Sequence, residues 1–315
     1  MPIKDSNADP EVGIVVVNYN GLEYSRECLD SLLAVDYPNY KIIFIDNGSN
    51  DESGNEIEKL YKDRIIYLQL DENLGVTGGN NAGIDYALKH DYQYVLFLNN
   101  DTVVEKTFLH NLVRTSQSDG NALVVPKIIC YYDRSRLDHY IGPEIDWWTS
   151  QPAGYQNYPL DAPHLNVKME IGIASTCCLL VPSNVIKAVG KMDQRYFMYQ
   201  DDSDFTIRAV RSSYRIIYDP ESVIYHKCNM SAKHKQNSYF EYYLQNRNVF
   251  YFYRKLCNKP FVKFWFLTKK MYFLISQAFK SIVAGNSLKR KVVFLLIKDI
   301  MIQKMGAPPD FNAIR

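Results

Sequence analysis

The stretch Leu96–Thr102 reads LFLNNDT, a short apolar run that ends in Asn99, Asn100 and Asp101. An apolar run of this length is typical of a buried β-strand. Two explanations exist for the carboxylate that follows it. Either Asp101 caps a helix over residues 102–113, or it binds a ligand at the carboxyl end of the strand.

Earlier segments repeat this pattern of a β-branched run that is followed by polar or glycine-rich residues. Strands are expected at 13–18, 41–46, 64–70 and 94–99, with a helix over 80–89 before the last of them. Strands that alternate with helices predict an α/β fold with a doubly wound, mostly parallel sheet. Ligands of such sheets bind just beyond the carboxyl ends of the strands. The polar residues at those ends are Asn18, Tyr19, Asn20, Asp46, Asn99, Asn100 and Asp101.

A glycine-rich segment, ENLGVTGGNNAG over residues 72–83, follows the third expected strand. Gly75, Gly78 and Gly79 allow the backbone to approach a ligand closely at the start of a helix, which suits a phosphate. One such loop alone is equally compatible with a plain turn. Four polar strand ends that meet at one edge of a sheet favour a ligand site.

The second half of the chain begins with residues 131–165, where the periodicity fades and Trp147 and Trp148 stand among Pro and Gly. This composition indicates a long functional loop region. The two tryptophans either pack within it or stack on a sugar or acceptor. Regular structure is expected to resume with a strand at 175–182 and a helix at 183–190.

An acidic cluster follows in FMYQDDSDFTIRA, residues 197–209, where Asp201, Asp202 and Asp204 stand at the start of an amphipathic helix. One of these acids suits an N-cap and the helix dipole. Three acids in four positions repel one another. That repulsion is tolerable mainly where a cation or a proton-transfer role offsets it.

The charge of the chain is unevenly distributed. Of 36 basic and 35 acidic residues, eleven basic and two acidic ones lie in residues 259–315. The sequence therefore predicts a basic, amphipathic helical tail behind an acidic domain over residues 1–258. Lysines interrupt the apolar runs of the tail, which are too short to span a membrane. The tail either lies on an anionic membrane surface or packs on the domain with a solvated basic face.

The bulk composition, 47% apolar and 23% charged residues, is typical of a soluble globular protein. The six cysteines form no CxxC pair, and the chain starts with a polar segment rather than a signal peptide. We therefore expect reduced thiols and a cytoplasmic location. No nucleic-acid partner is expected, and the oligomeric state stays open.

Six motifs taken together resemble the family 2 glycosyltransferases, and among them the rhamnosyltransferase-like members. The motifs are VVVNYNG, IDNGSND, ENLGVTGGNNAGI, LFLNNDT, FMYQDDSDFTIRA and PESVIYHK, and the segment YYLQNRNVFYFYRK extends the resemblance to about residue 255. The resemblance implies an inverting enzyme with the GT-A fold. Its Rossmann-like nucleotide-binding half would cover about residues 12–130 and its acceptor half residues 131–258.

The resemblance also implies roles for individual residues. Asn99-Asn100-Asp101 takes the place of the family's DxD motif, so Asp101 would bind Mg²⁺ or Mn²⁺ together with His226. Asp202 would be the general base, with Asp201 as the alternative. The residues implied in nucleotide-sugar binding are Asn18, Tyr19, Asn20, Asp46, Asn73, Gly75, Asn81, Asn99 and Asn100, and Trp147 and Trp148 are candidates for acceptor contact.

The chemistry of sugar transfer asks for these residue types. A divalent cation neutralises the charge that develops on the leaving diphosphate, and it needs few protein ligands. An inverting displacement also needs one carboxylate to take the proton of the acceptor hydroxyl. The chain departs from the family at three positions. Asn99 replaces an acid, so metal binding should depend on nucleotide; Asp201 stands where Glu is common; and Gln200 stands where Gly is common, which suggests a different acceptor environment.

The expected function is transfer of a sugar to a cell-surface glycan or a polyprenyl-linked acceptor at the inner face of the cell membrane. Rhamnose from dTDP-rhamnose is the favoured donor, and another hexose from a UDP-sugar is the next. An inactive paralogue that binds sugar nucleotides is one alternative. A nucleotidyltransferase is another, but it would need a basic, glycine-rich loop after the first strand, where this chain has NYNGLEYSRE.

Overall fold

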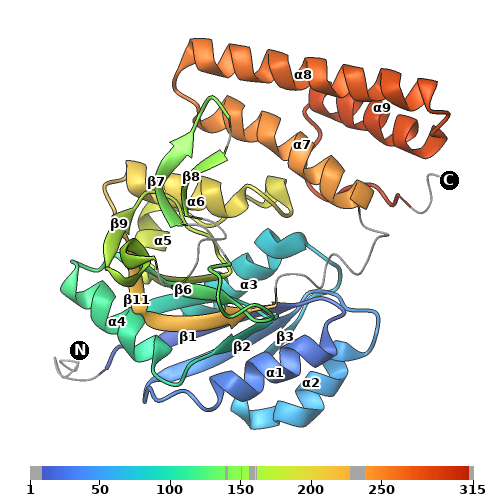
Figure 1. Ribbon diagram of the computed structural model, residues 1–315. Helices are drawn as coiled ribbons and strands as arrows, with labels where there is room; N and C mark the ends of the chain where they lie inside the picture. The colour runs from blue at the N-terminus through green and yellow to red at the C-terminus, as the bar shows by residue number, and fades with distance from the viewer. Residues whose placement is uncertain are drawn as a thin grey trace.

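The computed structural model describes residues 9–138, 141–149, 151–155, 160, 162–227 and 238–311 (Figure 1). The strands are β1 (Val12–Asn18), β2 (Tyr40–Asp46), β3 (Ile66–Gln69), β4 (Tyr94–Asn99), β5 (Thr102–Val104), β6 (Leu123–Cys130), β7 (Ile141–Asp146), β8 (Gln151–Tyr155), β9 (Met169–Ile171), β10 (Cys178–Pro182) and β11 (Ile216–His226). The α-helices are α1 (Leu22–Leu32), α2 (Ser53–Tyr61), α3 (Gly75–Lys89), α4 (Phe108–Ser118), α5 (Ser183–Val189), α6 (Asp201–Arg211), α7 (Ser238–Leu256), α8 (Pro260–Val283) and α9 (Ser287–Met301).

The main sheet has the strand order β3-β2-β1-β4-β10-β6-β11-β5, with β9 beside β11. The strands β3, β2, β1 and β4 are parallel, as are β6 and β11, whereas β10, β5 and β9 run antiparallel to their neighbours. The predicted doubly wound α/β architecture is confirmed. The β-branched runs of β1 and β2 are buried because helices cover both faces of the sheet.

Two apolar cores fill the spaces between the sheet and its helices. On one face, residues of β1, β2 and β4 pack against α1, α2 and α4, with Leu29, Ile57 and Leu112 among the buried side chains. On the other face, the sheet packs against α3, α5 and α6 through side chains such as Ile84 and Phe205. The carboxyl ends of β1, β2 and β4 therefore open between two helical layers.

A third apolar cluster joins α7, α8 and α9 to the hairpin β7–β8 and to residues just before α6 (Figure 1). The predicted helical C-terminal region is thus confirmed, and α8 and α9 pack on each other and on α7. Among the described residues, no helix combines the length and the apolar character needed to cross a membrane.

Two expectations about single elements were wrong. Residues 75–83 of the glycine-rich segment are the first part of α3, which begins at Gly75 rather than at residue 80. Residues 102–113 form the strand β5 and only then the helix α4, so Asp101 caps no helix there. The strand β11, which ends at His226, has an irregularity between Asp219 and Val223.

The glycines of α3 are needed because this helix lies very close to β1. A Cβ added to Gly83 would come within 2.3 Å of Val15 Cγ1, and one on Gly79 within 2.5 Å of Val17 Cγ1. No real Cβ tolerates such distances, so any side chain at either position must push the helix from the sheet.

We therefore expect Gly83→Ala to lower the free energy of unfolding by about 1–2 kcal/mol, because overpacking outweighs the gain in helix propensity. Urea unfolding followed by circular dichroism measures this change. The control is Asp85→Ala on the exposed side of the same helix, which should cost less than about 1 kcal/mol. A stabilised Gly83→Ala protein would contradict the close approach.

Candidate functional site

The side chain of Asn18 is the centre of a polar network at the carboxyl ends of the parallel strands. Its Nδ2 donates to Asp46 Oδ1 at 3.3 Å, to Ser49 Oγ at 3.1 Å and to Ser53 Oγ at 3.0 Å. Asn18 Oδ1 accepts from Asn100 Nδ2 at 3.2 Å. These bonds join the ends of β1, β2 and β4, and both Asn18 and Asp46 are buried.

Tyr19 and Asn20 lie at the exposed edge of this network. The Tyr19 ring is 45% exposed, which leaves an aromatic face available at the strand end. Asn20 has a left-handed backbone (φ 53°), and its Nδ2 donates to Asn50 Oδ1 at 2.9 Å. Asn99 is held through its backbone: its N–H donates to Cys177 O at 2.9 Å.

Asn47 holds the start of α3, a role that the sequence analysis did not assign to it. Its Nδ2 donates to Asn73 Oδ1 and to Gly75 O, each at 3.1 Å, and its Oδ1 accepts from the backbone N–H of Leu74 at 3.0 Å. Asn73 Oδ1 also accepts from the Gly75 N–H at 2.9 Å. The segment 73–75, called the donor loop below, is therefore fixed against the end of β2.

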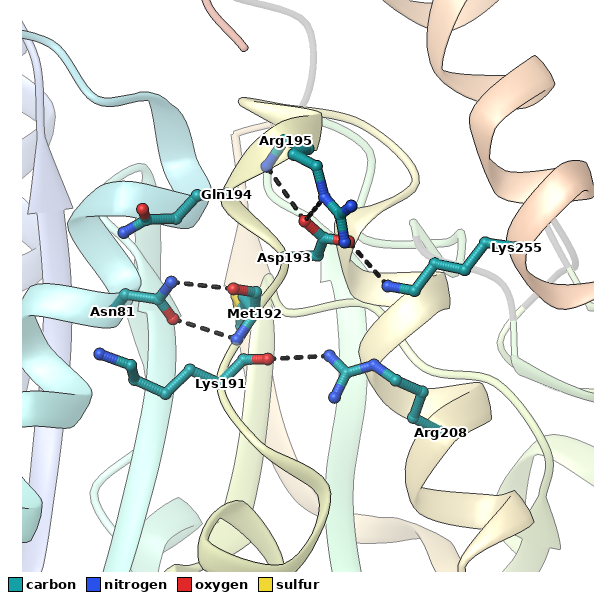
Figure 2. Close-up of a pocket in the computed structure, with 8 residues that line it drawn as sticks. All are labelled: Asn81, Lys191, Met192, Asp193, Gln194, Arg195, Arg208 and Lys255. Carbon is teal, nitrogen blue, oxygen red and sulfur yellow. Dashed lines mark hydrogen bonds and ion pairs between the residues drawn. The ribbon is translucent and has the colours of Figure 1, made fainter. Parts of the chain in front are cut away.

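Asn81 lies further along α3, and its side-chain amide forms hydrogen bonds with the backbone of another segment. Its Nδ2 donates to Met192 O at 2.9 Å, and its Oδ1 accepts from the Met192 N–H at 3.1 Å (Figure 2). Asn81 is buried. In this structure both ends of its amide fix the segment that leads from α5 towards α6.

Asp101 and His226 lie together because β5 pairs with the end of β11. Thr102 is opposite His226 in that ladder, and the Lys227 N–H donates to Asp101 O at 3.0 Å. His226 Nε2 is 3.1 Å from Asp101 Oδ1, while His226 Nδ1 is 2.5 Å from Asp138 Oδ2. Asp138 is a residue that sequence reasoning missed, because it follows β6 and is 88 positions from His226.

These residues fit a divalent cation in their chemistry. A carboxylate and an imidazole are suitable donors, and a carboxylate on the second ring nitrogen is the usual support for a metal-binding histidine. Burial lowers the pKa of His226, but Cys177, Asp101 and Asp138 raise it by more, so the net shift is upward. Among the described residues, no group of three or more His, Cys, Asp and Glu side chains is arranged to hold a metal by itself.

The three acids at the start of α6 have different environments. Asp201 is buried, and burial together with the charge of Asp202 raises the pKa of its carboxyl. Asp202 is partly exposed and accepts from the Ser203 N–H at 2.6 Å. Asp204 is fully buried between two cations: its Oδ2 is 2.7 Å from Arg208 Nε, and its Oδ1 is 2.6 Å from Lys255 Nζ. For Asp204, the cations that offset the negative charge are therefore the side chains of Arg208 and Lys255.

Gln200 precedes these acids in a left-handed conformation, with φ 68°. Glycine is favoured at such a φ, since other residues are strained there. The presence of Gln instead of Gly at position 200 therefore strains the backbone just before α6.

Trp147 and Trp148 lie in the turn of the hairpin β7–β8 and face the C-terminal helices. Trp147 stacks on Phe252 with ring centroids 5.6 Å apart, and Tyr253 Oη donates to Trp147 O at 2.8 Å. Trp148 is 45% exposed, and its ring centroid is 5.4 Å from that of Trp265 in α8. Packing accounts for Trp147, whereas Trp148 borders the solvent.

A cavity of about 420 Å³ opens between α3, α6 and α7 (Figure 2). Its lining residues are Asn81, Lys191, Met192, Asp193, Gln194, Arg195, Arg208 and Lys255. The basic side chains are paired with acids: Lys255 with Asp193 and Asp204, Arg195 with Asp193, and Lys191 with Asp85. Burial raises the pKa of Asp193, but hydrogen bonds from Arg195, Lys255 and Tyr251 lower it by more. This cavity is a structural junction rather than part of the strand-end site.

The curled, mostly parallel sheet with helices on both faces is the GT-A fold. A model of the family described as Glycosyl transferase family 2 matches residues 13–180. The chain belongs to this family. Its structure also resembles GalNAc-T7, solved with UDP, GalNAc and Mn²⁺, with a TM-score of 0.58 and 16% identity over 70% of this chain and 44% of that chain.

Two curated relatives agree with this assignment. The chain is 26% identical over 227 residues to an uncharacterized glycosyltransferase of Rickettsia typhi, which covers 70% of this chain and 65% of the relative. It is 25% identical over 241 residues to the low-salt glycan biosynthesis hexosyltransferase Agl10 of Haloferax volcanii, covering 76% and 74%. The chain thus spans just under two thirds of the Rickettsia protein and under half of GalNAc-T7.

The ion pairs of Lys255 generate a stability prediction. Lys255→Met leaves the carboxylates of Asp193 and Asp204 short of a cation, and we expect a loss of about 2–4 kcal/mol in the free energy of unfolding. The matched control is Lys191→Met, which removes only the exposed pair with Asp85 and should cost less than about 1 kcal/mol. Urea unfolding measures both variants, and equal losses would contradict the assignment of Lys255 as the central cation.

Proposed function

We propose that this glycosyltransferase is an inverting enzyme in which Asp202 is the general base. The observation that carries the proposal is the different state of the three acids of α6. Asp204 is neutralised by Lys255 and Arg208, and the buried Asp201 holds its proton more tightly than usual. Asp202 is the one of the three that is partly exposed, so it is best suited to accept the proton of an acceptor hydroxyl.

The donor in this proposal is a nucleotide sugar bound at the strand ends. Tyr19 offers an aromatic face for the base, and the half-buried Asn100, which the buried Asn18 holds in place, offers a hydrogen bond to the nucleoside. The donor loop lies at the start of α3, where the positive end of the helix dipole suits the diphosphate. The rhamnosyltransferase-like motifs favour dTDP-rhamnose, with UDP-sugars next.

We propose Asp101 and His226 as the protein ligands of Mg²⁺ or Mn²⁺. When bound, such an ion supplies positive charge for the leaving diphosphate. Asp138 would keep the His226 ring in the orientation needed, since it holds the Nδ1 atom. One carboxylate and one imidazole are few ligands, so we expect the remaining ones to come from the donor's phosphate oxygens and from water.

A donor-hydrolysis and transfer panel tests the function. Purified protein is incubated with dTDP- and UDP-sugars, with Mn²⁺, Mg²⁺ or EDTA, and released nucleoside diphosphate is measured. Asp202→Asn should reduce turnover at least 100-fold, because its amide cannot accept the proton, while nucleotide affinity stays within about twofold. Nucleotide binding without turnover under any condition would favour an inactive paralogue, and release of pyrophosphate from a nucleoside triphosphate would favour a nucleotidyltransferase.

Calorimetry of Mn²⁺ binding tests the assignment of Asp101 as a metal ligand. Mn²⁺ should bind weakly to the protein alone and at least tenfold more tightly in the presence of nucleoside diphosphate. Asp101→Ala should abolish that increase. An increase that survives Asp101→Ala would place the ion elsewhere.

We further propose that the acceptor is a glycan or a polyprenyl-linked sugar at the inner face of the cell membrane, and that α8 contacts the anionic lipid surface. One side of α8 packs inward through Val262, Phe266, Leu274 and Ala278. The other side exposes a stripe of large apolar side chains: Phe261, Phe264, Tyr272, Ile275, Phe279 and Val283. Residues 260–298 contain eight basic and no acidic side chains, which complements an anionic bilayer.

We expect Phe264→Ser combined with Phe279→Ser to reduce partition onto vesicles of phosphatidylglycerol and phosphatidylcholine at least tenfold, because each buried phenyl ring contributes on the order of 1 kcal/mol. The control is Leu60→Ser, an exposed apolar residue of α2 at the opposite end of the molecule (Figure 1). Co-sedimentation measures the bound fraction. Unchanged partition of the double variant would rule out α8 as the contact surface.

A further inference from the structure

The turn that delivers Asp201 and Asp202 is strained. Phe197, Tyr199 and Gln200 all have left-handed backbones, with φ values of 67°, 69° and 68°. Each such residue other than Gly costs on the order of 1–3 kcal/mol, and strained residues persist only where their surroundings hold them. Residues 196–200, called the catalytic turn below, therefore need an external support.

Asn248 of α7 supplies most of that support. Its Nδ2 donates to Tyr196 O at 3.0 Å, to Met198 O at 2.7 Å and to Tyr199 O at 3.0 Å. Buried carbonyls without a partner are costly. The NH₂ group of Asn248 shares its two hydrogens among three carbonyls of the turn, and Asn248 itself is completely buried.

Arg247 orients the Asn248 amide. Arg247 Nε donates to Asn248 Oδ1 at 3.0 Å, which fixes the opposite NH₂ group towards the turn, and Arg247 Nη2 donates to Tyr196 O at 3.3 Å. Arg247 is itself buried, and its Nη1 has no hydrogen-bond partner among the described residues. Burying a guanidinium without an ion-pair partner costs folding free energy, and a local cost of this kind is expected at positions that function requires.

The fourth carbonyl of the turn points to the donor loop. Phe197 O accepts from the backbone N–H and from Oγ1 of Thr77, each at 3.3 Å. A Cβ on Gly75 would come within 2.2 Å of the same oxygen, so only a glycine lets the turn and α3 approach this closely. The catalytic turn is thus held between α7 on one side and the start of α3 on the other.

From these contacts we infer that Asn248, oriented by Arg247, is a positioning residue that sets the carboxylate of Asp202 relative to the donor loop. This inference rests on the proposed function, because it assigns Asp202 the role of base. Asn248 acts through the backbone of residues 196–199.

The variant Asn248→Asp separates positioning from mere packing. An aspartate has the same shape and can pair with Arg247, which has no ion-pair partner among the described residues, so we expect the fold to be kept. Its oxygens cannot donate to the three carbonyls, however. We expect kcat to fall at least tenfold, while KM for the donor and the Kd of the nucleoside diphosphate change by less than about threefold.

Two further variants sharpen the result. Asn246→Asp is the matched control, since the Nδ2 of Asn246 donates within its own helix, to Tyr242 O at 2.7 Å. Gln200→Gly relieves the strain at one left-handed position and should restore part of the kcat lost in Asn248→Asp. A kcat that is unchanged in Asn248→Asp would overturn the inference. Equal effects of Asn246→Asp and Asn248→Asp on kcat would also overturn it.

Hydrogen exchange tests whether Asn248 supports the catalytic turn, and it needs no measurement of activity. Amides of the peptide 194–204 should exchange at least tenfold faster in Asn248→Asp than in Asn246→Asp or the unaltered chain. If the unaltered chain turns over no donor, the proposed function fails while this measurement still tests the support of the turn. Exchange that is equal in all three proteins would show that Asn248 does not hold the turn.

Discussion

The buried amide of Asn18 ties the carboxyl ends of β1, β2 and β4 into one rim. Parallel strands deliver their polar ends to the same edge, but they do not fix how those ends lie relative to one another. A side chain with two donors and an acceptor can do so, because it bonds to several strand ends at once. The burial of Asn18 makes the arrangement rigid, since water cannot replace the bonds.

The same physical device recurs at the other loops of the site. Asn47 holds the donor loop, Asn81 holds the segment around Met192, and Asn248 holds the catalytic turn. Each of these asparagines pairs with backbone groups that no strand or helix satisfies. A carboxylate in their place could accept but not donate, and would bring charge to a buried position. The amides therefore build the site, and the carboxylates of Asp101 and Asp202 are the ones to which we assign chemical roles in the proposal.

The sequence predicted what depends on local pattern. The strands β1, β2 and β4 and the polar residues at their ends follow from β-branched runs that stop abruptly, and six motifs in order pointed to the family. What it missed depends on contacts between distant residues. Asp138 reaches His226 from another loop, and Asn248 reaches the catalytic turn from α7. The start of α3 was placed too late, because glycines that usually mark a turn are here required by close packing on β1.

The acidic start of α6 shows why composition alone cannot assign a base. Asp201, Asp202 and Asp204 are near neighbours on one helix and share its dipole, which favours a negative charge on each. Tertiary contacts then separate them: Lys255 and Arg208 balance Asp204, burial raises the pKa of Asp201, and Asp202 is partly exposed. The direction of each side chain is set one step earlier, by the left-handed residues of the catalytic turn. Since that turn rests on both α7 and Gly75, the helix that carries the proposed base and the loop that faces the proposed donor share one mechanical support. A change in either support would move the acid and the donor relative to each other, and an inverting displacement is sensitive to that distance.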